Sequence, residues 1–272
     1  MYEAYWRLQS KPFEPQVDAR SYYPSEVHQG AMLKLRYAIE NQRGAALLAG
    51  APGTGKSMLI HSLRRQLPEA FSPFVHLVFP QLSQREMLAY LAAELDPAHE
   101  LPTASVDASV RRLQHFLAQN ATQGRHAVVA VDEAHLLLDS NGLETVRLLL
   151  NFDRAGRPAL TLLLLGTPAL LTGLERMPAL DQRLGVKCLL RPLTLEETVS
   201  YVNHRLTAAG AKQEIFTSEA LQSLFQLTLG NPRLINRLCD LALLIGYAEE
   251  QPSIGQAQLE AVSNELVTVQ PE

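Results

Sequence analysis

An eight-residue motif places the strongest constraint on how this chain folds. Residues 50–57 read Gly-Ala-Pro-Gly-Thr-Gly-Lys-Ser, between an apolar run at residues 45–49 and a helix-compatible stretch at residues 58–67. A glycine-rich loop between a strand and a helix lets successive backbone N–H groups point at phosphate oxygens, and the helix N-terminus adds partial positive charge. The motif therefore predicts that the chain binds a nucleoside triphosphate.

Two side chains of this loop have distinct expected roles. Lys56 is expected to reach the terminal phosphates, and Ser57 is expected to ligate Mg²⁺, so ATP and Mg²⁺ are the predicted cofactors. The predicted nucleotide-binding residues are Gly50, Ala51, Pro52, Gly53, Thr54, Gly55, Lys56, Ser57 and Met58.

A pair of acidic residues follows a second apolar run. Residues 127–131 read Ala-Val-Val-Ala-Val and precede Asp132 and Glu133. A run this apolar suits a strand buried on both faces of a parallel sheet. At its carboxyl end Asp132 is expected to hold Mg²⁺ through water, and Glu133 to deprotonate the water that attacks the γ-phosphate. Two solvated acids would fit this position equally well alone, but the phosphate-binding loop favours the catalytic roles, and Glu133 favours hydrolysis as well as binding.

Strand and helix patterns alternate over the first two thirds of the chain. Strand-like runs lie at residues 45–49, 74–79, 127–131, 160–165 and 186–190. The alternation predicts an α/β fold with a five-stranded, doubly wound parallel sheet and flanking helices. Ser83 and Glu86 form a capping-box pattern before a helix at residues 84–95, and apolar spacing predicts another at residues 105–120.

The pattern changes after Pro192, where no strand-like run follows. Helices are expected at about residues 194–209, 217–229, 232–249 and 255–266. The predicted organisation is a nucleotide-binding α/β domain at residues 1–191 and a small all-helical lid at residues 192–272. This is the plan of AAA+ P-loop NTPases.

Composition gives weaker constraints. The net charge of −4 and the pI of about 6.1 do not indicate nucleic-acid binding. Cys188 and Cys239 have apolar neighbours and no metal-ligand spacing, which predicts buried free thiols in a reducing compartment. The N-terminus lacks the apolar core of a signal peptide, and the uncharged run at residues 158–174 is shorter than the ~20 residues of a membrane helix. We therefore expect a cytoplasmic protein without direct membrane insertion.

Several shorter segments indicate which group of ATPases the sequence resembles. With the two nucleotide motifs, they resemble the general secretion pathway protein A (ExeA-like) group of AAA+ ATPases, and the resemblance covers nearly the whole chain. The segments are Met1 to Glu3, Lys11 to Phe13, Ser25 to His28, Leu149 to Phe152, Leu165 to Leu170, Asp181 to Leu184 and Gly230 to Asn236.

The resemblance implies roles for two residues near the strands. Thr167 matches the sensor-1 position, where it would hold the attacking water or sense the γ-phosphate, while a helix cap before Pro168 is the alternative. Arg183 matches the arginine finger, which stabilises transition-state charge on a neighbour's ATP and so implies a homo-oligomer. Arg176 is the competing finger, and an ordinary surface arginine is the alternative reading.

The resemblance also implies roles for the lid and the N-terminal segment. Arg233 matches sensor 2 and would reach the γ-phosphate in cis. A cation at a helix N-terminus is locally unfavourable, which favours a phosphate partner over a purely structural role. Tyr22, Tyr23 and His28 lie in the segment, residues 1–44, that covers the adenine in related proteins, and ordinary core aromatics fit them equally well. The implied catalytic residues are Glu133, Lys56, Thr167, Arg183 and Arg233.

The best-known secretion members of the group continue into a membrane helix and a peptidoglycan-binding domain, whereas this sequence ends at Glu272. We therefore expect only the motor or switch role to carry over. The leading hypothesis is an ATP-hydrolysing, oligomerising protein that remodels or regulates a secretion or pilus-type assembly through protein partners.

A DNA-associated regulator of the transposition-ATPase type is the alternative function. Arginines that could pair with phosphate lie at residues 64–65 and 111–112 and at Arg154 and Arg157. Such doublets are more often solvated helix faces. Residues 132–135 also spell a helicase box, but a helicase of that type needs two such domains.

Overall fold

The structure is a computed structural model that describes residues 1–14, 22–98, 105–154 and 156–268, and the chain divides into two compact units. Within the described residues, the sheet unit contains residues 27–52 and 59–190. The helical unit contains the N-terminal residues to Glu26, residues 53–58 and the residues from Arg191 onward.

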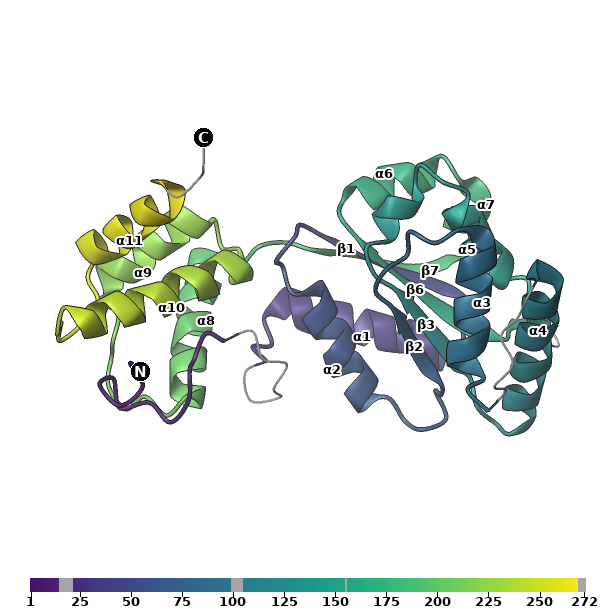
Figure 1. Cartoon of the computed structure of the whole chain (residues 1–272), viewed down its shortest axis with the longest axis horizontal. Coiled ribbons are helices and arrows are strands. Elements are labelled where there is room, and N and C mark those ends of the chain that lie inside the picture. The colour runs from purple at the N-terminus through teal and green to yellow at the C-terminus, as the bar shows by residue number, and fades with distance from the viewer. Residues whose placement is uncertain (15–21, 99–104, 155, 269–272) are drawn as a thin grey trace. The chain divides into compact units, whose positions relative to one another are not determined.

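A five-stranded, fully parallel sheet forms the middle of the sheet unit (Figure 1). The strand order is β2-β3-β6-β1-β7, so β6 lies between β1 and β3. This confirms the predicted fold class. The strands are β1 (Ala45–Gly50), β2 (Phe74–Leu77), β3 (Ala127–Val131), β6 (Leu160–Gly166) and β7 (Leu184–Leu190), and a two-stranded hairpin pairs β4 (Asp153–Arg154) with β5 (Arg157–Pro158).

One predicted strand is shorter than expected. Val78 and Phe79 were included in the run at residues 74–79, but β2 ends at Leu77 and both side chains are 64% exposed. The strand ends there because β3, its neighbour, ends at the paired Val131, and Pro80 follows without an N–H to donate.

Helices cover both faces of the sheet because successive strand residues point to opposite sides. Ala45 and Leu47 of β1 pack in one core, and Ala46 and Leu48 pack in the other. The first core is covered by α3 (Gln84–Leu95), α4 (Val106–Thr122), η2 (Ala134–Leu137), α5 (Gly142–Leu149), α6 (Ala169–Glu175) and α7 (Pro178–Asp181), and the second by α1 (Glu26–Glu40) and α2 (Lys56–Gln66).

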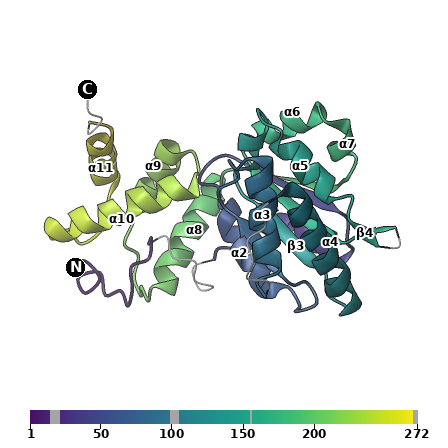
Figure 2. The same cartoon turned by 45° about the vertical axis from the view of Figure 1, so that its right-hand side comes forward.

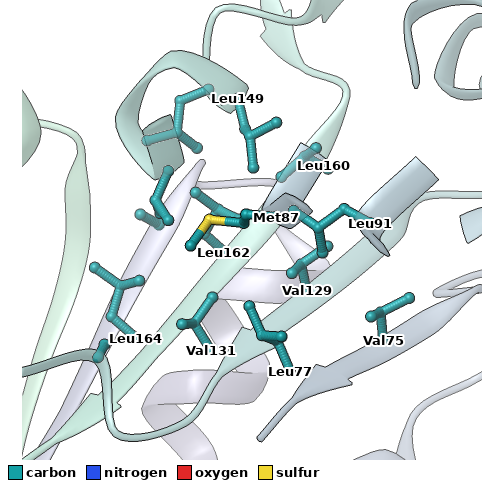
Figure 3. Packing of buried hydrophobic residues seen from close by; sticks show 14 of the residues in the cluster. Val75, Leu77, Met87, Leu91, Val129, Val131, Leu149, Leu160, Leu162 and Leu164 are labelled. Atoms are coloured by element: carbon teal, nitrogen blue, oxygen red, sulfur yellow. The ribbon is translucent and has the colours of Figure 1, made fainter. Parts of the chain in front are cut away.

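In the first core, helix α3 packs against the strands through large apolar side chains. Helices α3 and α4 lie side by side, as two views show (Figures 1 and 2). Met87 and Leu91 of α3 are buried among strand residues that include Val129 (Figure 3). Each large apolar side chain buried in this way contributes roughly 1.5–3 kcal/mol to folding.

The helical unit contains α8 (Leu195–Ala208), α9 (Ser218–Thr228), α10 (Pro232–Ala248) and α11 (Gln256–Thr268). The predicted capping box is present at Ser83 before α3, a second capping box is present at Thr194 before α8, and Asn231 caps α10 with Pro232 in its first turn. These caps satisfy N–H groups that a helix start leaves unbonded, so these helix starts follow from local sequence.

The N-terminal segment packs with the helices. Trp6 is 2% exposed and its indole N–H donates to the carbonyl of Leu243 over 2.9 Å. The buried Arg205 of α8 donates to the carbonyls of Pro12 and Glu14. The expected boundary placed residues 1–44 with the sheet. Residues 1–14 and 22–26 instead group with the helical unit, because their aromatic side chains complete its core.

A buried histidine gives the sheet unit a pH-dependent stability. The side chain of His126 is buried before β3, with Nε2 2.8 Å from the hydroxyl of Thr161, and burial lowers its pKa to about 4. In the unfolded chain the pKa is about 6.5. The unfolded state therefore binds the proton more tightly between these values, and stability falls as the pH falls through this window.

We expect the free energy of unfolding to fall by up to about 3 kcal/mol between about pH 6.5 and 4 because of His126 alone. His126→Phe keeps a buried ring without a titrating group and should flatten this part of the profile, measured by urea unfolding at a series of pH values. His115→Phe, on the exposed surface of α4, is the matched control. An unchanged slope in His126→Phe would contradict the assignment.

Candidate nucleotide-binding site

Apart from Arg183, the predicted site residues of the sheet unit lie at the carboxyl edge of the sheet. Val131 pairs with Leu164, which pairs with Leu47, so the ends of β3, β6 and β1 lie at the same edge. Asp132 follows β3, and Thr167 follows β6. Since β6 lies between the other two strands, Thr167 leaves the sheet between the start of the phosphate-binding loop and the two acidic residues.

Two glycines of the predicted phosphate-binding loop have positive φ angles. Gly53 and Gly55 have φ of +84° and +95°, conformations that side chains disfavour. Lys56 is the first residue of α2 and is 6% exposed, while Ser57 is exposed in the same turn. The loop therefore ends on a helix N-terminus that carries a buried lysine. The helix expected at residues 58–67 is present and begins two residues earlier, at Lys56.

Within the helical unit, Gly53 lies against the start of α10. A Cβ on Gly53 would lie 2.5 Å from Oδ1 of Asn231 and 2.8 Å from Cβ of Arg233. Asn231 Oδ1 accepts the backbone N–H of Arg233 over 3.0 Å. Arg233 itself is exposed in the first turn of α10. The backbone of Gly53 therefore lies close to the Cβ of the predicted sensor-2 arginine.

The two acidic residues have different environments. Asp132 is buried, and its Oδ1 accepts the backbone N–H of Glu133 over 2.9 Å while its Oδ2 lies 3.3 Å from Nε2 of His76. The side chain of Glu133 is 49% exposed, with Oε2 3.3 Å from Nδ1 of His135. Glu133 also has left-handed backbone angles, φ 48° and ψ 34°. This conformation costs a non-glycine residue roughly 1–2 kcal/mol, and such strain concentrates at functional sites.

Thr167 does not cap the helix that follows it. Helix α6 begins at Ala169, its N-cap residue is Pro168, and no side-chain cap bond is present. The threonine is half-buried at the end of β6. The helix-cap alternative is therefore not supported.

Arg183 lies at the opposite edge of the sheet. It directly precedes β7, whose first residue, Leu184, pairs with Ala45, whereas Gly50 pairs with the last residue, Leu190. Five residue steps of a strand span about 16 Å, so Arg183 is far from the point where the phosphate-binding loop leaves its own sheet. An arginine placed there cannot act on its own chain's nucleotide from this position.

The turn that carries Arg183 is held in place. Its Nη1 donates to Oδ1 of Asn151 over 2.8 Å. Lys187 pairs with Asp181 over 2.5 Å across the same turn. Arg176, the competing finger, is exposed at the end of α6.

The aromatic residues expected near adenine are buried or half-buried, and Tyr23 contacts other rings. Tyr23 lies edge-on to Tyr201 and contacts the ring of His204 within the helical unit, while Tyr22 is half-buried and His28 of α1 is buried. Tyr23 and His28 therefore occupy packed positions, as the alternative interpretation of ordinary core aromatics predicts.

Comparison with known proteins identifies the family. Residues 39–174, half of the chain, match the AAA domain. The chain belongs to the AAA family of ATPases. General secretion pathway protein A of Aeromonas hydrophila is 34% identical over 279 aligned residues, which cover 100% of this chain and 50% of that protein. The chain therefore spans about half the length of this curated relative.

Solved structures with low sequence identity share the fold of this AAA protein. Drosophila ORC bound to DNA has a TM-score of 0.72 at 19% identity, covering 98% of this chain and 66% of that one. Aeropyrum pernix ORC2, in ADPNP and ADP complexes, has 0.69 at 15%, covering 94% and 72%. The Thermotoga maritima RuvB branch migration motor has 0.60 at 18%, covering 93% and 73%. Within the described part of this AAA protein, every helix is too short or too polar to span a membrane.

Two residues in the site region of this AAA protein had no role predicted from the sequence. His76 contacts Asp132, and Asn151 contacts Arg183. His76 is the polar residue in the otherwise apolar strand at residues 74–77, and a shielded histidine needs a hydrogen-bond partner. This pattern could have indicated a polar contact for His76. Asn151 lies 32 positions from Arg183 in sequence, so no local pattern could have paired them.

The contact at Gly53 of this AAA protein can be tested with a matched pair of substitutions. Gly53→Ala should weaken ATP binding about tenfold or more, because the added Cβ meets Asn231 and Arg233 as well as a disfavoured φ. Gly124→Ala has nearly the same φ, +73°, in open space and should leave the affinity unchanged. Isothermal titration with ATP measures both, and equal affinities would contradict the expected crowding.

Proposed function

We propose that this chain binds ATP with Mg²⁺, hydrolyses the γ-phosphate, and does so as an oligomer. The observation that carries the proposal is the shared carboxyl edge, where the phosphate-binding loop, Asp132 and Glu133, and Thr167 follow three neighbouring parallel strands. Membership of the AAA family supports it.

The side chains present fit Mg²⁺ and ATP. Ser57 and Asp132 would hold Mg²⁺, and both offer the oxygen donors that this ion prefers. When bound, Mg²⁺ would neutralise charge on the phosphate oxygens. Lys56 would face the β and γ phosphates, and the other predicted loop residues would donate backbone N–H groups.

The remaining predicted residues would each have a separate role in hydrolysis. Glu133 would take the proton of the attacking water, and Thr167 would hold that water or sense the γ-phosphate. Arg233 would reach the γ-phosphate within the same chain, in keeping with its contact to Gly53. The helices from residue 192 onward would thus act as a lid. Arg183 would stabilise transition-state charge on the ATP of a neighbouring copy.

We further propose that this ATPase works in the cytoplasm, where it remodels or regulates a secretion or pilus-type assembly through protein partners. The identity to general secretion pathway protein A supports this role, and the buried free thiols of Cys188 and Cys239 fit a reducing compartment.

A DNA-associated regulator is the second candidate, because DNA-bound Drosophila ORC shares the fold. Two of the arginines that could pair with DNA already have carboxylate partners: Arg111 with Asp107 and Arg112 with Asp96. These pairs favour the protein-directed role. Steep salt-dependent retention on duplex DNA would reverse this preference.

A pair of variants separates binding from hydrolysis. Lys56→Ala should lose ATP binding, because the ammonium supplies the main side-chain charge toward the phosphates. Glu133→Gln should keep binding and lose turnover by a factor on the order of 10²–10⁴, since the amide cannot take a proton. Calorimetry and phosphate release measure the two effects. Turnover at the wild-type rate in Glu133→Gln would remove Glu133 from the mechanism.

Oligomeric action predicts that ATPase activity per chain rises with protein concentration. Arg183→Ala should bind ATP normally and hydrolyse it on the order of 10³-fold more slowly. A mixture of Arg183→Ala with Glu133→Gln should recover activity, because a shared interface can combine the intact Glu133 of one copy with the intact Arg183 of the other. Activity that is independent of concentration and is not restored by mixing would reject the trans role.

A further inference from the structure

A histidine in the middle of a sheet strand contacts the carboxylate proposed to hold Mg²⁺. His76 lies in β2, and its Nε2 is 3.3 Å from Oδ2 of Asp132. The two side chains are 12% and 7% exposed, so little water competes with this contact. A shielded contact of this kind restrains the carboxylate more than a surface contact would.

The other atoms of Asp132 are also restrained. Its Oδ1 accepts the backbone N–H of Glu133, and its own N–H donates to the carbonyl of Leu77 over 2.8 Å. With its proton on Nε2, His76 donates to Oδ2 while the N–H of Glu133 donates to Oδ1, so the two contacts together restrain the rotation of the carboxylate.

A second histidine, His61, packs against His76. The ring of His61 lies edge-on to the ring of His76, with centroids 5.6 Å apart and planes at 77°. Burial lowers the pKa of His61, and the neighbouring His76 and Arg64 lower it further while Asp132 opposes them. His61 belongs to α2, one turn after Ser57, so the contact joins the helix that begins at the phosphate-binding loop to the strand beside Asp132.

We infer that His76 is a positioning residue, which holds the Asp132 carboxylate in the orientation that Mg²⁺ binding requires, and that His61 holds the ring of His76. The inference rests on the proposed function, since it assigns Asp132 to the metal. Residues that orient a metal-binding group typically change metal affinity or activity 10–100-fold when they are replaced.

Two substitutions at His76 separate this role from simple packing. His76→Leu keeps the bulk and removes the donor, whereas His76→Gln places an amide N–H near the position of Nε2. We expect His76→Leu to raise the Mg²⁺ concentration for half-maximal turnover about tenfold or more. His76→Gln should restore most of the wild-type dependence. His61→Ala should raise the same concentration by a smaller factor, and wild-type Mg²⁺ dependence in this variant would reject the seating role of His61.

A readout independent of turnover is the rise in melting temperature that ATP causes with and without Mg²⁺. His76→Leu should lose the additional rise that Mg²⁺ brings and keep the rise due to ATP alone. His115→Leu, on the exposed surface of α4, is the matched control and should behave as wild type. Should His76→Leu fail to fold, His76→Asn, which is polar but too short to reach Asp132, takes its place.

Wild-type Mg²⁺ dependence in His76→Leu would overturn the inference. If His76 only packs, the Leu and Gln variants should both lose ATP binding equally with and without Mg²⁺, and this result would also overturn the inference. If the wild-type chain shows no Mg²⁺-dependent ATP binding at all, the proposed function fails first. The two failures are therefore distinguishable.

Discussion

The parallel pairing of β3, β6 and β1 is the constraint on which the rest of the structure depends. These strands are buried on both faces, which is why their residues are almost entirely aliphatic and why helices must cover both sides. Polar groups are excluded from most of the strand length by the cost of burying them. They appear instead where the strands end, and parallel pairing brings those ends to one edge.

Locally unfavourable features are concentrated at that edge. Glu133 has left-handed backbone angles, Gly53 and Gly55 have positive φ, and Lys56 and Asp132 are buried ionisable residues. The left-handed angles of Glu133 and the burial of Lys56 and Asp132 each lower stability when considered alone, and the positive φ angles restrict positions 53 and 55 to glycine. The aliphatic strands and their helices supply the stability that holds these groups in place, and bound phosphate and metal would offset their charges.

The two edges of the sheet have different proposed roles. The carboxyl edge carries the residues proposed to act on the chain's own nucleotide, whereas Arg183 lies at the amino edge, before β7. In this proposal, one sheet separates the surface that binds nucleotide from the surface that carries Arg183. A neighbour in an assembly can use the second surface, which is the physical basis for expecting activity to depend on oligomerisation.

Local patterns in the sequence determined the elements and most of the candidate site. Aliphatic runs, capping boxes at Ser83 and Thr194, and the Asn231-Pro232 start of α10 are short-range signals, and the structure contains each of them. Only the tertiary structure decided the order of the strands, the packing of Trp6 with the helices and the contacts of His76 and Asn151. These depend on residues far apart in sequence that meet because apolar faces must be covered, and no local spacing encodes such a meeting.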